Sequence, residues 1–401
     1  MSALFNLFYI YDPWFFHVLR MAFVVGLLAL AILGLKYLKK DLPQGLNIPL
    51  DSLGAILGLI GFSFIPLLIN GSQDFSVVIQ YSKILILFTF GLGIYQLFYC
   101  HPAGQLQVIR DLKIGIGLQA LIGFLALMGL PFMVDMLLGT NAMMPRFFGS
   151  EQEYRLYNIT SSAFFQLSLF YLVLLHFLLA YNAKHNSISS LFLFLMLCIG
   201  LISGRTFLML SVISILLYFK WRYLPALIAF GLLIIGLALY MPEHRYVEHA
   251  LEPLINIIKM IKIRFFGFPV ETITLSASAD NLVQNHLYLP EPKQLLMGDG
   301  YYYTSEGKYY GATDSGFIRQ VLYGGVPYLL ACAAFTFYFV YRLAQNWFNG
   351  SWKFILSLMF ILSICHIKAD TYAFPGLMLV LIMFLSLFGP AGKQMILFKR
   401  G

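Results

Sequence analysis

Residues 188–219 read ISSLFLFLMLCIGLISGRTFLMLSVISILLYF, and Arg205 is the only charged residue in this stretch. Such a run is typical of membrane-spanning helices. Read as one helix, it would move the later basic loops to the outer side, although Lys and Arg concentrate in cytoplasmic loops. We therefore predict two short helices, 188–202 and 206–219, each roughly 22 Å long. The turn carrying Arg205 would then lie within the depth of the membrane, where irregular backbone lines a wet cavity or is buried in protein.

The composition of the whole chain agrees with this reading. Hydrophobic residues make up 60% of the 401 residues and charged residues only 11%, and the mean hydropathy is +0.80. Soluble domains carry about 25% charged residues, so these few charges cannot cover an aqueous surface. We predict an all-α polytopic membrane protein. The net charge of +8 belongs to short loops, as membrane insertion requires, and does not predict nucleic-acid binding.

Apolar runs bounded by charged or turn residues predict about 11 transmembrane helices. The predicted spans are 14–37, 51–69, 77–98, 114–134, 161–181, 188–202, 206–219, 223–241, 317–343, 353–367 and 373–390. Basic residues gather in alternate loops, which makes that side cytoplasmic. Three segments result: 1–241 with eight helices and an outer loop at about 135–160, a large outer loop at 242–316, and 317–401 with three helices.

The large outer loop begins with an amphipathic stretch, Glu248 to Phe266. Its apolar residues recur at helical spacing. They are Leu251, Leu254, Ile255, Ile258 and Ile261. Such a helix either lies on the membrane or caps a cleft, or it packs on the bundle as an ordinary loop helix. The sequence leaves both readings open.

A tyrosine run follows Asp299 in the same loop. Tyr301, Tyr302 and Tyr303 come next, with further tyrosines at 309 and 310. Tyrosines near an outer face often form only an interfacial belt. Because these lie in a loop rich in glycine and charge, stacking on sugar rings is the functional alternative.

Several catalytic motifs are missing from the sequence. It contains no GxxxxGK[ST], HExxH, Asp-x-Asp or GxSxG pattern, so we expect no metal and no cofactor. Arginines instead recur in the outer segments. A guanidinium binds phosphate oxygens bidentately and keeps its charge, which suits a substrate that carries a pyrophosphate. For Arg155 we expect a salt bridge to Glu151 or Glu153.

Four segments carry a family resemblance: Arg146 with Gly149, SGRT at 203–206, LMGDGY at 296–301, and DSGFIR at 314–319 followed by Gly324–Gly325. In this order, and on one predicted side, they resemble the O-antigen and capsule repeat-unit polymerases of the bacterial inner membrane, relatives of the O-antigen ligases. A spaced Arg-x10-Gly pattern known in some members is missing at Arg146, where position 157 is Tyr.

The resemblance implies a glycosyltransferase type C fold with its active site facing the periplasm. The expected reaction joins oligosaccharides carried on undecaprenyl pyrophosphate, and the expected partners are this lipid-linked substrate, membrane lipid and a chain-length regulator protein. We assign the pyrophosphate to Arg146, Arg205 and Arg319. The base candidates are His286, Asp314 and His366, and the glycan candidates are Asp299, Tyr301, Tyr302 and Tyr303.

Two other functions stay open. An O-antigen ligase would share the architecture and differ in its product. A flippase or secondary transporter belongs to another class. Transporters bind their substrates near the bilayer midplane, often between internal repeats. This chain has no detectable repeat, and its arginines gather toward the outer end of the bundle, so we favour a polymerase.

Overall fold

The computed structural model describes residues 1–15, 17–41, 45–141, 147–266, 281–390, 392 and 394–397. It is 74% helical, and strands in these ranges form two short antiparallel pairs. Six helical segments in the described ranges are long and apolar enough to cross a membrane: Met21–Leu38, Leu50–Asn70, Ser76–Phe98, Phe164–His185, Trp221–Tyr240 and Gly316–Phe348. The chain is therefore an all-α multi-pass membrane protein, as the composition predicts.

The chain forms two compact units, Met1–Gly115 with His286–Gly401 (unit 1) and Ile116–Asn285 (unit 2). The elements of unit 1 are α1 (Ser2–Tyr11), β1 (Trp14–Phe15), β2 (Leu19–Arg20), α2 (Met21–Leu38), β3 (Leu46–Pro49), α3 (Leu50–Asn70), α4 (Ser76–Phe98), α14 (Pro292–Met297), η4 (Tyr310–Ala312), α15 (Gly316–Phe348), α16 (Trp352–Lys368), α17 (Leu377–Leu385) and β4 (Gln394–Leu397). Those of unit 2 are α6 (Pro131–Thr140), η1 (Glu153–Leu156), α8 (Phe164–His185), α9 (Ser190–Ser203), α10 (Arg205–Leu217), η2 (Trp221–Tyr223), α11 (Leu224–Tyr240) and α12 (Arg245–Phe266). Helix α5 (Gly104–Leu127) and the turn η3 (Leu282–His286) cross the unit boundaries.

Every predicted span overlaps a helix in the structure, but the span 14–37 begins with β1 and β2, and the span 114–134 runs from α5 into the separate helix α6. Six are the long apolar segments above, and the others fall on α5, α9, α10, α16 and α17. The number of crossings, near eleven, stays a prediction because these last helices are shorter or less apolar. The two units cut across the expected segment 1–241. The sequence did not predict α1, a short apolar helix of largely buried residues.

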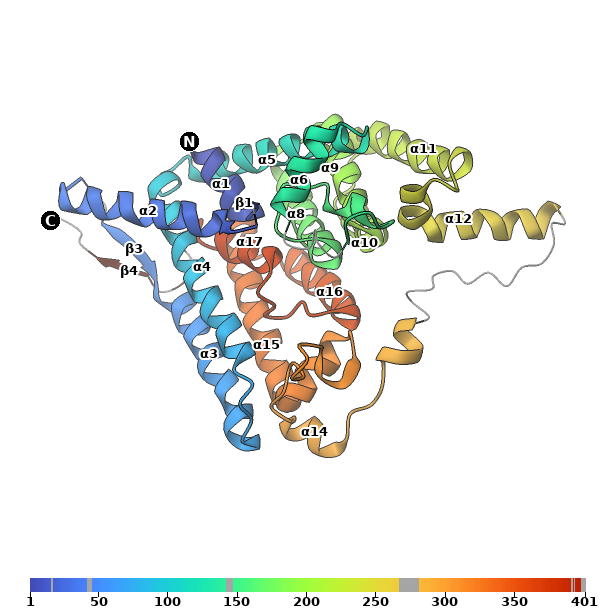
Figure 1. The fold of residues 1–401 in the computed structure, drawn as a ribbon. Coiled ribbons are helices and arrows are strands. Elements are labelled where there is room, and N and C mark those ends of the chain that lie inside the picture. The colour runs from blue at the N-terminus through green and yellow to red at the C-terminus, as the bar shows by residue number, and fades with distance from the viewer. Residues whose placement is uncertain are drawn as a thin grey trace. The chain divides into compact units, whose positions relative to one another are not determined.

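In unit 1, α3 packs against both α4 and α15 (Figure 1). Helix α15 is long enough to cross a membrane, but its helical geometry is interrupted at Gly324 and Gly325. Gly325 has φ 75°. This left-handed region favours glycine. Pro327 follows, and its missing N–H leaves the carbonyl of Tyr323 without a helical donor. Two glycines and a proline within four residues therefore break α15 at this point.

The Gly298–Asp299–Gly300 segment supplies the missing donors. The amide of Asp299 donates to the carbonyl of Leu322 at 2.7 Å, and the amide of Gly300 donates to that of Tyr323 at 2.9 Å. A side chain on Gly298 would lie 2.5 Å from the Tyr323 carbonyl oxygen, so the contact requires glycine there. The break in α15 is therefore a docking point for the loop that precedes the tyrosine run.

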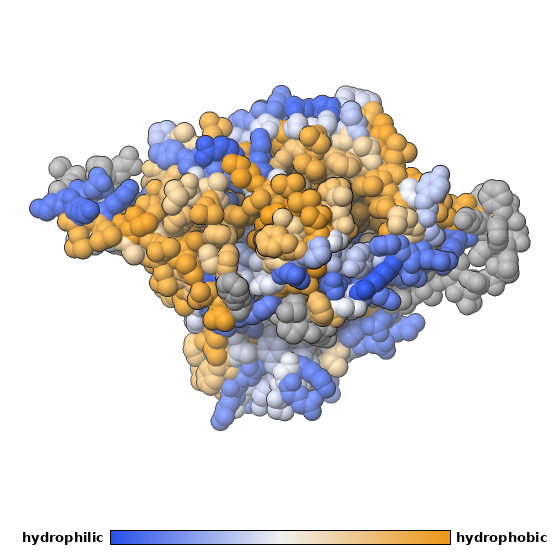
Figure 2. All heavy atoms as spheres, turned by 45° about the horizontal axis from the view of Figure 1, so that its top comes forward, coloured by the Kyte–Doolittle hydropathy of each residue, from blue (hydrophilic) through white to orange (hydrophobic). Residues whose placement is uncertain are grey.

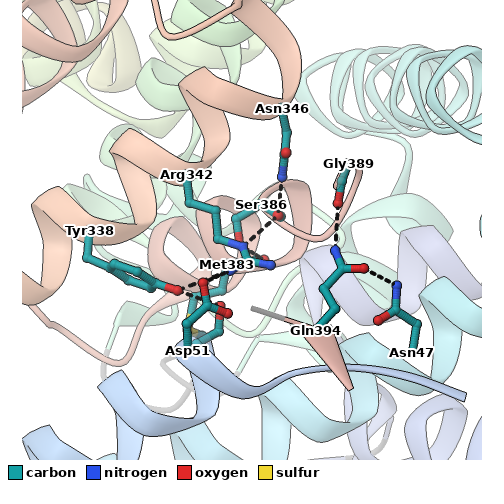
Figure 3. A network of polar contacts seen from close by, with 10 residues as sticks. Asn47, Asp51, Tyr338, Arg342, Asn346, Met383, Ser386, Gly389 and Gln394 are labelled. Carbon is teal, nitrogen blue, oxygen red and sulfur yellow. Dashed lines mark hydrogen bonds and ion pairs between the residues drawn. The ribbon is translucent and has the colours of Figure 1, made fainter. Parts of the chain in front are cut away.

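The other end of α15 is held by a second polar network (Figure 3). The Arg342 guanidinium pairs with Asp51 at the start of α3 and also donates to the hydroxyl of Tyr338 at 3.1 Å. Asn346 donates to the carbonyl of Ser386 at 2.7 Å, after α17. These bonds satisfy a buried arginine and join α3, α15 and the chain after α17.

In unit 2, α8 packs against both α9 and α10, and α9 also packs against α11. Residues at the start of α12, including Leu251, join a hydrophobic cluster with Tyr154 and Leu137. Large hydrophobic side chains remain exposed on helices of both units, for example Leu68 (80%) and Leu232 (66%). Figure 2 shows such residues over much of the visible face, as expected for a surface solvated by lipid.

Candidate functional site

The turn between α9 and α10 is the predicted break in the 188–219 run. Gly204 has φ 150° and ψ 165°, a conformation open almost only to glycine. A Cβ at Gly204 would lie 2.8 Å from Oγ of Ser168 and 3.0 Å from Nη2 of Arg155. The absent side chain therefore lets the Arg155 guanidinium rest against the turn whose next residue is Arg205.

Arg155 forms no salt bridge with any carboxylate in the described residues. Its Nη1 has a long contact of 3.4 Å to Oε1 of Gln152, and its buried Nε has no hydrogen-bond partner in the described part of the chain. The guanidinium faces the ring of Phe164 at 5.2 Å. Burial lowers the pKa of Arg155, and the charge of Arg205 adds to that effect.

The expected bridge from Arg155 to Glu153 is wrong because Glu153 has other partners. Its Oε2 accepts the backbone N–H of Gly149 at 2.6 Å, and its Oε1 accepts the hydroxyl of Tyr157 at 2.8 Å. The carboxylate therefore closes the outer loop on itself. Glu151 forms no salt bridge with Arg155 either.

Arg205 is the first residue of α10 and pairs with Glu252 of α12. His249 lies one turn before Glu252, and the charges of both arginines act on the pKa of its imidazole. Burial, and then the charges of Arg155 and Arg205, lower the pKa of His249 to about 4. The imidazole is therefore neutral at neutral pH, so within this group two guanidinium charges face one carboxylate.

Unit 2 also contains an apolar cavity of about 280 Å³, whose lining includes the chain neighbours of Arg155 and Glu252. It is lined by Leu127, Tyr154, Leu201, Ile202, Leu237, Met241, His244, Tyr246, Val247, Ala250 and Leu251. Tyr154 immediately precedes Arg155, and Leu251 immediately precedes Glu252. A ligand with an anionic head and an apolar chain matches this arrangement.

The tyrosine run of unit 1 forms a small hairpin. Tyr303 pairs with Tyr309 as an antiparallel bridge, and their rings stack at 5.5 Å between centroids. Asp74, in the turn between α3 and α4, accepts the amides of Tyr302 and Tyr303 at 2.7 and 3.1 Å. Burial acts to raise the pKa of Asp74, but these bonds and those from Ser76 outweigh it and lower the pKa.

The glycan candidates differ in exposure. Tyr301 is 42% exposed, and its ring lies 5.8 Å from that of Tyr310. Tyr302 is buried and packs against Tyr323. Asp299 accepts Nε2 of Gln294 at 2.7 Å and the hydroxyl of Tyr310 at 3.1 Å. Tyr301 therefore offers a ring to a ligand, whereas Tyr302 anchors the hairpin.

The structure brings two of the predicted base candidates together. Nε2 of His286 lies 3.8 Å from Oδ2 of Asp314, whose side chain is 56% exposed. Nδ1 of His286 lies 3.0 Å from the carbonyl oxygen of Ala312. A carbonyl only accepts, so Nδ1 carries the proton and Nε2 of the neutral ring is the basic atom.

Arg319, in the first turn of α15, is paired inside unit 1. Its Nη1 lies 2.8 Å from Oδ2 of Asp370, and both side chains are buried. Nη2 donates to the carbonyl of Asp314 at 2.5 Å, and the guanidinium carbon lies 3.8 Å from the centre of the Tyr309 ring. Arg319 thus ties together the hairpin, the Asp314 segment and the chain after α16.

His366 is completely buried between the rings of Phe317 and Tyr372. Its Nδ1 accepts the amide of Thr371 at 3.0 Å, and its Nε2 has no hydrogen-bond partner among the described residues. In this conformation no acceptor hydroxyl in solvent reaches it. The third pyrophosphate candidate, Arg146, lies outside the described residues.

Sequence reasoning missed Arg155 and His249 as members of the arginine group. The signal for Arg155 was present, because it lies in the outer loop at about 135–160, shortly before an apolar helix. It was assigned to nearby carboxylates that the fold uses elsewhere. His249 gave no signal, since Arg155 and Arg205 are distant from it in sequence. Neither a protein-family model, a curated protein nor a solved structure matches this chain.

Proposed function

We propose that this protein is a membrane glycosyltransferase that polymerises oligosaccharide repeat units carried on undecaprenyl pyrophosphate. The observation that carries the proposal is Arg155, a guanidinium without a carboxylate partner among the described residues, which lies against the Gly204–Arg205 turn. Its chain neighbour Tyr154 lines an apolar cavity. The fold expected for this activity is the glycosyltransferase type C bundle, with the active site facing the periplasm.

The charge balance of the arginine group favours a phosphate ligand. Two guanidinium groups face a single carboxylate, Glu252, so the group carries a net positive charge. An unbalanced charge within the depth of a membrane is costly unless it is paired or lines a functional cavity. A pyrophosphate offers several oxygens to two arginines and needs no rearrangement of protonation state.

The apolar cavity of unit 2 extends the argument from an anion to a lipid-linked anion. Its lining is almost entirely hydrophobic, and it shares Tyr154 and Leu251 with the segments that present Arg155 and Glu252. A free inorganic anion has no apolar surface to bury against this lining, so the lining would not add to its binding free energy. A prenyl chain attached to the pyrophosphate would bury apolar surface there, at about 25 cal/mol per Å² removed from water.

The arginines would act on the leaving group. An acceptor hydroxyl attacks the anomeric carbon, the bond from that carbon to the pyrophosphate oxygen breaks, and the hydroxyl proton passes to a base. Arg155 and Arg205 would stabilise the negative charge that develops on the departing pyrophosphate.

The test is polymer formation by the purified protein in lipid nanodiscs, supplied with undecaprenyl-pyrophosphate-linked repeat units. Products are resolved by chain length. Arg155→Ala and Arg205→Ala should each reduce polymer yield at least tenfold. Arg222→Ala is the matched control, because Arg222 is exposed and its guanidinium donates to the backbone carbonyl of Ile188; it should leave the yield unchanged.

Other outcomes identify other functions. Glycan transferred to added lipid A core, with no elongation on undecaprenyl pyrophosphate, would identify a ligase. Movement of the lipid-linked unit across a vesicle membrane without any new glycosidic bond would identify a flippase. Wild-type polymer from both arginine variants at equal protein levels would disprove the pyrophosphate assignment.

A further inference from the structure

Helix α12 has two parts with different surroundings. The helix is bent at Leu251, which has φ −112° and ψ 16°, just before Pro253. Residues before the bend, such as Val247 and Ala250, are buried in the hydrophobic cluster of unit 2. A proline inside a helix removes one backbone bond and kinks it, so the segment after the bend takes its own direction.

The second part of α12 exposes large hydrophobic side chains. Ile257, Met260 and Ile261 are 43%, 44% and 47% exposed. Their spacing of three and four residues places them on one stripe of the helix. Ile255 is buried and Ile258 packs against the cluster, so this part of the helix has a packed side and, at Ile257, Met260 and Ile261, an exposed apolar side.

The charge of this part is uniformly positive. From Leu254 to Phe266 the sequence contains Lys259, Lys262 and Arg264 and no acidic residue. Lys259 is exposed. A helix that combines an apolar stripe with basic residues lies in the membrane interface, with its apolar side chains among the acyl chains and its cations near anionic headgroups.

We propose that the segment Leu254–Phe266 of α12 lies in the membrane interface and binds the headgroups of anionic phospholipids. The excess of positive charge selects this occupant over a second copy of the chain, whose own net charge is +8. The inference does not depend on the proposed enzymatic function. It concerns a surface that the arginine group does not use.

The full-length protein in nanodiscs provides the test. An environment-sensitive dansyl amino acid is introduced genetically at position 257 or 260, on the exposed stripe, and at position 256 as the comparison. Each protein is placed in phosphatidylcholine discs and in discs containing phosphatidylglycerol. We expect emission at 257 and 260 to shift to the blue relative to 256, further in phosphatidylglycerol, and to return toward the red at high salt.

A charge variant separates the headgroup contribution from apolar insertion. Lys259→Gln with Lys262→Gln and Arg264→Gln should abolish the dependence on phosphatidylglycerol. The matched control removes the same charge from the end of α2, with Lys36→Gln, Lys39→Gln and Lys40→Gln, and should preserve the dependence. Equal thermal midpoints establish that the variants fold. If the emission wavelength at positions 257 and 260 does not change with lipid composition or salt, the proposal is wrong and the helix packs against protein.

Discussion

Arg319 and Asp370 form a buried ion pair, with 2.8 Å between Nη1 and Oδ2 and side-chain exposures of 3% and 1%. The pair joins the first turn of α15 to the chain that follows α16. The same guanidinium lies against Tyr309 and holds the Asp314 carbonyl. Its position explains how a hairpin of tyrosines and the His286–Asp314 pair are fixed to the bundle.

Asp370→Asn should destabilise the protein strongly. It leaves the Arg319 cation buried without its counter-charge, and removing one partner of a buried pair costs about 3–5 kcal/mol. The thermal unfolding midpoint of the purified protein in detergent measures the effect. The double variant Arg319→Met with Asp370→Leu should recover most of the loss, because no unpaired charge remains. Equal midpoints for Asp370→Asn and the wild type would mean that the pair is solvated.

Gly325→Ala should detach the Gly298–Asp299–Gly300 segment from α15. Gly325 has φ 75°, and a Cβ there would lie 2.5 Å from the carbonyl oxygen of Leu296. Backbone strain of this kind costs on the order of 1–3 kcal/mol. Limited proteolysis should show faster cleavage after residue 290.

Gly58→Ala is the control for that substitution. Gly58 lies inside α3, and a Cβ there meets nothing within 4 Å. Alanine is favoured over glycine inside a helix by roughly 0.5–1 kcal/mol, so cleavage should not increase. Equal cleavage of Gly325→Ala and the wild type would contradict the docking of the loop through the break in α15.

The sequence predicted those features that depend on local residue type. The break in α15 follows from two glycines and a proline within four residues, and the α9–α10 turn follows from Gly204 and Arg205 within an apolar run. Pairings between distant residues were not predictable. Nothing near Arg319 in the sequence identifies Asp370 as its partner. Likewise, Glu153 is near Arg155 in sequence, but Tyr157 and the Gly149 amide bind its carboxylate.

Glu252→Gln should increase the affinity of the arginine group for inorganic pyrophosphate. The Glu252 carboxylate occupies Arg205 and competes with an anionic ligand. Removing its charge should lower the Kd about two- to tenfold, equivalent to roughly 0.4–1.4 kcal/mol. Isothermal titration calorimetry of the full chain in detergent measures this. Glu248→Gln, one turn earlier on α12 and exposed, is the control and should leave the Kd unchanged. An unchanged or weaker affinity in Glu252→Gln would show that the carboxylate does not compete.

The stability of unit 2 should fall in mild acid because of His249. Its folded-state pKa of about 4 lies below the ordinary value of 6.5, mainly through burial and then through the charges of Arg155 and Arg205. The unfolded chain therefore binds a proton that the folded chain does not, so the contribution of His249 to the free energy of unfolding declines as pH falls below about 6.5 and levels off near 4. Denaturant titrations of the wild type and of His249→Gln between pH 7.5 and 4 measure this contribution. His244→Gln is the control for other histidines; the His244 ring nitrogen Nδ1 lies near the Tyr246 amide. The difference in unfolding free energy between wild type and His249→Gln should change in this pH window. A constant difference would mean that His249 is hydrated in the folded protein and lies outside the field of the two arginines.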